Sequence, residues 1–220
     1  MRKRTIGFLI ALSALIILLV FPFVGCASYD PLPGDLYVGG TVGATGLILE
    51  PPAWDTLSVS MTNIPLPAAL APTDMPYVNS HVPAFDPDAI NVMYFSAQLP
   101  HTYKEGTDIE FHIRVVYPDA GAGDSVWYFT YSWANEGDTF PGATATTIVS
   151  PSTGVADELH EIGILAAING AGKRIGSELL CSIQRSGTLG TDTYANYVYL
   201  ISCDFRYQVD MLGSRQETIK

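Results

Sequence analysis

The sequence predicts an all-β protein, a jelly-roll-like sandwich of two antiparallel sheets that follows an extended N-terminal arm. Apolar and polar residues alternate with a period of two in about nine successive runs, as they do in half-buried strands. No run is clearly helical, and the connections are rich in Gly and Pro and irregular in length. This combination favours a two-sheet sandwich over a helical or layered α/β fold.

The alternation is clearest in the centre of the chain, between positions 94 and 141. In the run 109–115 apolar residues alternate with Glu110, His112 and Arg114, and in the run 126–133 every second residue is aromatic. The segment 118–124 (PDAGAGD) has the Pro and Gly content of a hairpin, so we expect the two strands to be neighbours in one sheet. The aromatic row could be core or a sugar-stacking platform, and the area of its rings favours core. Its members are Trp127, Phe129, Tyr131 and Trp133.

The other predicted strands lie on either side of this centre. Residues 55–63 and 91–99 alternate, and the proline-rich stretch from Pro65 to Ile90 is expected to be a long surface loop of the kind that often binds a ligand. The threonine-rich run 142–150 is expected at or near a sheet edge. Residues 158–168 suit a strand or a helix, but the following NGAGK favours a hairpin that pairs them with 177–185. One long strand, 193–211, ends the fold.

The N-terminus predicts export. Residues 1–25 combine a basic start with a long apolar stretch, as a signal sequence does. Gly25 and Cys26 resemble the junction of a bacterial lipoprotein signal, so we expect Cys26 to be lipidated and to anchor the chain in the membrane. Ordinary secretion and an uncleaved membrane helix are the alternatives. Residues 26–53 would then form a Gly/Pro-rich arm or tether, and residues 54–220 the sandwich domain.

Composition and charge exclude two classes of protein. Hydrophobic residues make up 48% of the chain and charged residues 15%, which argues against a disordered protein. The formal net charge is −11, and three of the eleven basic residues lie in the signal sequence, whereas none of the 22 acidic residues does. A polyanion such as nucleic acid would be repelled by the remaining charge.

We predict no catalytic residue, no cofactor and no metal ligand. Lys173 follows the sequence NGAG, but the first glycine and the Ser or Thr of a phosphate-binding loop are missing. The four histidines lack metal-ligand spacing. Aspartates in turns offer oxygens to calcium, although Asp is favoured in turns in any case. These are Asp86, Asp88, Asp119 and Asp124.

Cys181 and Cys203 both fall at inward positions of predicted strands. Two interpretations are open: they are small buried apolar residues, or they form a disulfide between neighbouring strands in an oxidising compartment. The chain has three cysteines in all, too few for a fold that depends on disulfides.

Polar side chains on the outward faces of two strands predict a contact surface. His112 and Arg114 share one face of the run 109–115, and Asp204 and Arg206 share one face of the last strand. We expect all four to face outward and to lie close together, where exposed ion pairs add little stability. Their density predicts contact with a neighbouring subunit, and hence a homo-oligomer.

Several phrases resemble a poorly characterised family of β-rich proteins from tailed-phage and environmental viral genomes. The resemblance spans residues 54–220 and implies a virion-associated or prophage-encoded, oligomeric surface module without catalytic residues. The family pattern carries histidines where this chain has Arg114 and Arg206, so a metal role of the family would not extend to it. The phrases are AWDTLSVSMTN, FSAQLPHTYKEGTDIEFHIRV, YSWANEGDTFP, GKRIGSELLCSIQR and FRYQVDMLGSRQE.

Residues and resemblance together predict a non-catalytic structural or recognition module, not an enzyme. We expect it to be exported and lipid-anchored at the cell envelope, or alternatively to be part of a virion, with a glycan or a virion protein as partner. The alternative function is an envelope carbohydrate-binding or adhesive lipoprotein that uses the loop 65–90. An extracellular hydrolase is the third and weakest hypothesis.

Overall fold

The computed structural model describes residues 42–43, 46–62, 64–163 and 167–212. The predicted signal sequence, Cys26 and most of the predicted arm lie outside these residues. The described residues belong to one unit, 39–220, and contain eleven strands and no helix. The strands are β1 (Val42–Gly43), β2 (Gly46–Ser60), β3 (Thr73–Tyr77), β4 (Ser80–Phe85), β5 (Ile90–Gln98), β6 (Glu110–Val116), β7 (Asp124–Ala134), β8 (Thr144–Pro151), β9 (Leu159–Gly163), β10 (Glu178–Ser186) and β11 (Val198–Met211).

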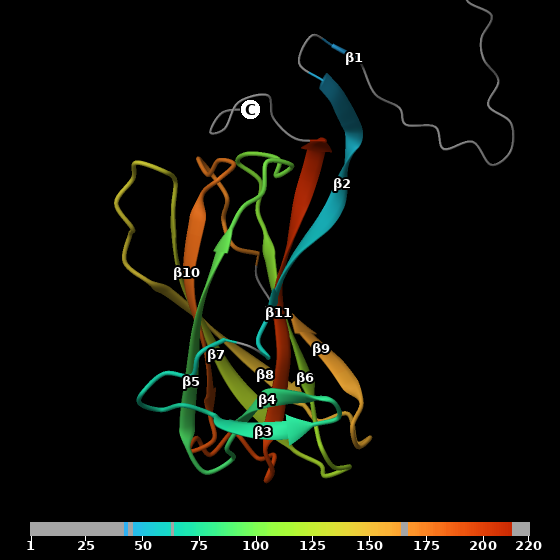
Figure 1. The fold of residues 1–220 in the computed structure, drawn as a ribbon, viewed down its shortest axis with the longest axis vertical. Coiled ribbons are helices and arrows are strands. Elements are labelled where there is room, and N and C mark those ends of the chain that lie inside the picture. The colour runs from blue at the N-terminus through green and yellow to red at the C-terminus, as the bar shows by residue number, and fades with distance from the viewer. Residues whose placement is uncertain (1–41, 44–45, 63, 164–166, 213–220) are drawn as a thin grey trace, which may run out of the picture. The chain divides into compact units, whose positions relative to one another are not determined.

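Eight of these strands form a jelly roll of two antiparallel sheets (Figure 1). One sheet has the order β2-β11-β6-β9, extended by β1 on β2 and by the β3–β4 hairpin, which joins the start of β11. The other has the order β5-β10-β7-β8. Of the connections between successive strands among these eight, only the one from β7 to β8 stays within a sheet. All the others cross from one sheet to the other. This double-sheet arrangement confirms the predicted fold class.

Two predicted hairpins are wrong because both connections cross between the sheets. β6 pairs with β11 and β9, whereas β7 pairs with β10 and β8, so the segment 118–123 is an arch. Its Gly123 has φ +140°, and a Cβ there would lie 2.6 Å from the carbonyl oxygen of Thr193. The glycine therefore permits close packing against the β10–β11 connection. Likewise, β9 and β10 belong to different sheets, so NGAGK does not pair them.

The aromatic row of β7 lies in the core, as predicted. Trp127, Phe129 and Trp133 are buried, and Tyr131 is half-buried against the same core. Phe129 stacks on Phe111 of the opposite sheet with ring centroids 3.6 Å apart. This contact explains why β6 and β7 face each other, because each presents an apolar face that needs a partner sheet.

Two predicted boundaries change. The stretch 65–90 is not one long loop, since it contains β3 and β4, which pair with each other. β2 begins at Gly46 and runs through position 53, so the sheet starts inside the predicted arm. Prolines mark turns and edges reliably, but they do not prevent short edge strands such as β3 from forming.

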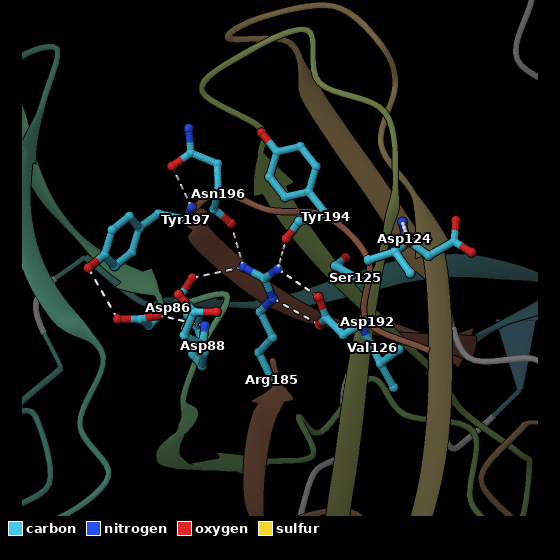
Figure 2. Close-up of polar contacts among 12 residues, drawn as sticks. Asp86, Asp88, Asp124, Ser125, Val126, Arg185, Asp192, Tyr194, Asn196 and Tyr197 are labelled. Atoms are coloured by element: carbon cyan, nitrogen blue, oxygen red, sulfur yellow. Dashed lines mark hydrogen bonds and ion pairs between the residues drawn. The ribbon is translucent and has the colours of Figure 1, made fainter. Parts of the chain in front are cut away.

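A buried arginine joins the end of the sandwich where β10 leads into β11 (Figure 2). Arg185 lies on the inward face of β10 and is fully buried, and it forms a two-pronged ion pair with Asp192 at 2.8 and 3.0 Å. Its remaining N–H groups donate to the carbonyl oxygens of Phe85, Tyr194 and Asn196 at 2.6–3.0 Å. All five donors of the guanidinium are thus used, which fixes the connection 187–197 against β4.

Cys181 and Cys203 are both buried and both free, so the disulfide interpretation is not met. Burial raises the pKa of both thiols, and nearby acidic groups add to the effect. The two cysteines therefore behave as small apolar residues of the core.

Candidate functional site

The outer face of the four-stranded sheet carries a groove made of two hollows that both include Leu180. One hollow, of about 490 Å³, lies over the middle of β5, β10 and β7. The other, of about 660 Å³, lies at the ends of the same strands beside the loop 135–143. Both are open to solvent and of the size that ligand pockets have.

Strand register places the groove side chains in rows across the sheet. Tyr94 lies opposite Ser182, and Ser96 lies opposite Leu180. On the other side of β10, Leu180 lies opposite Ser132. The row at the strand ends pairs Gln98 with Glu178. Because side chains alternate along a strand, these residues point outward while Phe95 and Cys181 point into the core.

The loop 135–143 forms one wall of the groove and is held by its own hydrogen bonds. Asn135 donates to Asp138 at 2.9 Å and to the carbonyl oxygen of Gly172 at 3.1 Å. Its own carbonyl oxygen, Oδ1, accepts the backbone N–H of Arg174 at 2.9 Å. The hydroxyl of Ser132 donates to the carbonyl oxygen of Pro141 at 2.7 Å. The wall is thereby fixed to β7 and to the connection before β10.

Three large apolar side chains in the groove remain exposed. Tyr94 is 60% exposed, Leu180 48% and Phe140 41%. The polar part of the described lining includes the carboxylates of Glu136, Asp138 and Glu178 and the imidazole of His101, but no Lys or Arg. A ligand would therefore meet apolar rings beside acidic and hydroxyl groups, a setting that repels polyanions.

The sequence prediction missed this groove. The alternation in residues 91–99, with Met93, Phe95 and Ala97 inward, already places Tyr94 outward. The contribution of Phe140 has no such signal, because it depends on how the loop 135–143 folds back over the sheet.

The structure brings the four predicted contact residues together on the outer face of the other sheet. Asp204 of β11 lies opposite His112 of β6, and Arg114 contacts Asp204 at 2.9 Å. Glu161 of β9 joins them, since Arg114 reaches it at 3.1 Å and Arg206 and His112 also contact it. Three side chains are partly exposed as expected, but Asp204 is fully buried beneath the cluster. That they contact a neighbouring subunit stays a prediction.

The two carboxyl groups of this cluster have opposite pKa shifts. Burial raises the pKa of Asp204, an effect that Arg114 and His112 only partly offset. For Glu161, burial is outweighed by Arg206 and Arg114, which hold its pKa below the ordinary value. Among the described residues, the buried oxygens of Asp204 have no hydrogen-bond partner apart from the Arg114 ion pair, so the ionised form is poorly compensated.

The remaining candidates have structural roles in the described residues. Lys173 donates to the carbonyl oxygen of Trp133 at 2.6 Å and lies over its ring. Asp86 and Asp119 each accept a backbone N–H two residues later, as Asp does in turns. No described group of three or more His, Cys, Asp or Glu is placed to hold a metal ion. No helix in this part of the chain is long and apolar enough to cross a membrane.

Comparison with known proteins defines no family for this jelly roll. No protein-family model matches the chain, and no curated protein matches it. Several solved structures are distantly similar to this chain, and three of them are described below. Dimeric latent PorU from Porphyromonas gingivalis has a TM-score of 0.34 and 12% identity, over 82% of this chain and 15% of that one.

The other two structures are similarly distant. The CBM22-1–GH10 modules of Clostridium thermocellum xylanase 10B, complexed with xylohexaose, have a TM-score of 0.27 and 10% identity, over 56% of this chain and 25% of that one. Desmodium yellow mottle tymovirus has a TM-score of 0.24 and 9% identity, over 86% of this chain and 99% of that one. This chain thus spans a small part of the first two proteins. Similarity at this level says nothing about its ligand or activity.

Proposed function

We propose that this protein is a non-catalytic recognition module that binds a carbohydrate chain in the groove of its four-stranded sheet. The observation that supports the proposal is the groove itself, two adjoining hollows with exposed Tyr94, Leu180 and Phe140. Binding sites commonly combine apolar and aromatic surface with a few polar groups that orient the ligand. The aromatic row of β7 is the other candidate platform, but Trp127, Phe129 and Trp133 are buried in the core and Tyr131 is half-buried against it.

The lining favours an uncharged sugar polymer. The apolar face of a sugar ring can pack on an aromatic side chain, and its hydroxyls can pair with carboxylate, amide and hydroxyl groups such as those of Glu178, Gln98 and Ser96. Acidic groups in a lining whose described residues include no Lys or Arg disfavour uronic acids, sulfated glycans and nucleic acids. An open groove with two hollows suits an extended chain better than a single small molecule.

Exposure of the groove carboxylates supports binding rather than hydrolysis. A general acid for glycoside cleavage needs an apolar setting that keeps it protonated at neutral pH. Glu136 and Asp138 are exposed and Glu178 is half-buried. Asp138 also accepts a hydrogen bond from Asn135. These groups are placed to accept hydrogen bonds from a ligand.

The proposal also includes export and lipidation, which are supported by the signal-like sequence of residues 1–25 and by the position of Cys26. A lipid anchor would hold the module at the cell envelope, with the groove available to surface polysaccharides.

The second candidate is the virion-associated role that the phage-family resemblance implies. The eight-strand topology favours it as much as the first, because jelly rolls recur in viral capsid and in lectin domains. Capsid, portal and tail genes beside the coding gene would support the second candidate.

Binding to a panel of neutral and acidic polysaccharides tests the first candidate. The protein should bind at least one neutral polymer and release no soluble sugar from it. Tyr94→Ala or Phe140→Ala should weaken binding roughly tenfold, the effect of losing about 1.4 kcal/mol. Trp54→Ala is the matched control, since Trp54 is 55% exposed but lies on β2 of the other sheet. Equal loss in the control, or turnover of the polymer, would contradict the proposal.

A further inference from the structure

Most sheet edges in the described residues carry a feature that prevents pairing with another chain. Edge strands are usually protected by charge, proline, short length or a covering loop. β2 contains Pro51, Pro52 and Asp55, β3 contains Asp74 and Pro76, and β9 has five residues that include Glu161. The loop before β5 covers part of its edge, where the N–H of Val92 donates to the carbonyl oxygen of Leu70 at 2.7 Å.

β8 is the exception. It is the last strand of the four-stranded sheet and pairs with β7 alone among the described strands. Its eight residues, TATTIVSP, carry no charge, and the one proline is the final residue, Pro151. Its register with β7 is continuous from Thr144 to Pro151, without a bulge. It therefore presents a regular row of backbone N–H and C=O groups to any added strand.

An exposed apolar side chain accompanies this edge. Val149 of β8 is 55% exposed on the outer face of the four-stranded sheet, since its neighbour Ile148 points into the core. A strand added beside β8 would cover part of this apolar surface, which is favourable.

We propose that β8 pairs antiparallel with β8 of a second copy of this chain. The lack of charge on β8 decides where two copies can meet. In a strongly acidic chain, pairing at β8 brings no like charges of the two strands together. Antiparallel pairing of identical strands is self-complementary, and the threonines of the two strands can lie opposite one another, a favourable cross-strand pair.

The dimer has a consequence for recognition, which rests on the proposed function. Antiparallel pairing at an edge places a two-fold axis perpendicular to the sheet, so the two four-stranded sheets continue as one. Both outer faces then lie on the same side, and both grooves can bind one polymer. Two linked sites bind a long ligand more tightly than one site without any new contact.

Light scattering of the full chain in detergent, without ligand, tests the proposal across a concentration series. The parent should form a discrete dimer, and Thr147→Lys should be monomeric, because it puts like charges near the two-fold axis. Thr147 is exposed, so the variant should keep the parent's fold. The control is Thr188→Lys, the same change in an exposed position of the β10–β11 connection, which should stay dimeric.

A second measurement identifies the surface directly. Thr147→Cys should cross-link two copies under mild oxidation, whereas Thr188→Cys should not. A monomeric parent, a dimeric Thr147→Lys, heterogeneous aggregates or cross-linking at position 188 would each overturn the proposal. A dimer that binds no carbohydrate would overturn the proposed function and leave the dimer standing.

Discussion

Replacement of Arg185 by methionine should destabilise the protein more than almost any other single change. The side chain is fully buried and its five N–H groups meet Asp192 and three carbonyl oxygens at 2.6–3.0 Å. Arg185→Met leaves the carboxylate of Asp192 buried, where it still accepts the backbone N–H of Val126 but has lost its countercharge. Loss of one partner of a buried ion pair costs about 3–5 kcal/mol. That is a large part of the 5–15 kcal/mol that typically stabilises a domain.

Urea unfolding followed by tryptophan fluorescence measures this cost, because Trp127 and Trp133 are buried in the same core. Arg174→Met is the control, since Arg174 is exposed and its removal should change the free energy of unfolding by less than about 0.5 kcal/mol. The double variant Arg185→Met/Asp192→Leu should recover part of the loss, because it removes the unpaired charge as well. A loss below about 1 kcal/mol in Arg185→Met would refute the reasoning.

Three further predictions concern the core, the charged cluster and the anchor. Phe129→Ala should cost about 3–5 kcal/mol in a urea titration, because the ring is buried and stacked on Phe111; an unchanged midpoint with lost ligand binding would restore the platform interpretation. Burial raises the pKa of Asp204, so the protonated side chain stabilises the fold. This stabilisation is complete below about pH 3.8 and is lost as the pH rises through the folded-state pKa. Above the folded-state pKa, Asp204→Asn should therefore be more stable than the parent. Glu161 has a lowered pKa, so Glu161→Gln should lose stability relative to the parent above about pH 4.5 and converge with it in acid; parallel pH profiles of the parent and both variants would contradict these assignments. Cys26→Ala should abolish incorporation of a fatty-acid analogue in cells, and label that persists would exclude lipidation at this residue.

Sequence alternation predicted the strands because burial of one sheet face imposes a period of two. It also contains the signal for Arg185, which follows Leu179, Cys181 and Ile183 on the inward face of β10. Alternation likewise places Tyr94 outward. The inward or outward direction of a side chain is thus readable from one strand alone.

Strand pairing was not readable in the same way. PDAGAGD and NGAGK contain the residues of tight turns, but the same residues allow a chain to arch from one sheet to the other. The choice depends on which apolar faces pack together, and that is a property of strands far apart in sequence. Phe111 and Phe129 decide it at the first connection. For the same reason, the sequence contains no signal for the groove as a whole. One wall of the groove is the loop 135–143, and its position depends on how it folds over the outer face of the sheet.

Nuclear magnetic resonance titration with a neutral oligosaccharide that the protein binds is the most direct test of the proposed recognition site. Labelled Tyr, Phe, Leu and Trp side chains would report both sheets in one experiment. The account predicts shifts centred on Leu180, where the two hollows meet, and extending to Tyr94 and Phe140, with the Trp54 signal unchanged. Shifts centred on Trp54 and the other sheet, with the groove signals unchanged, would contradict it.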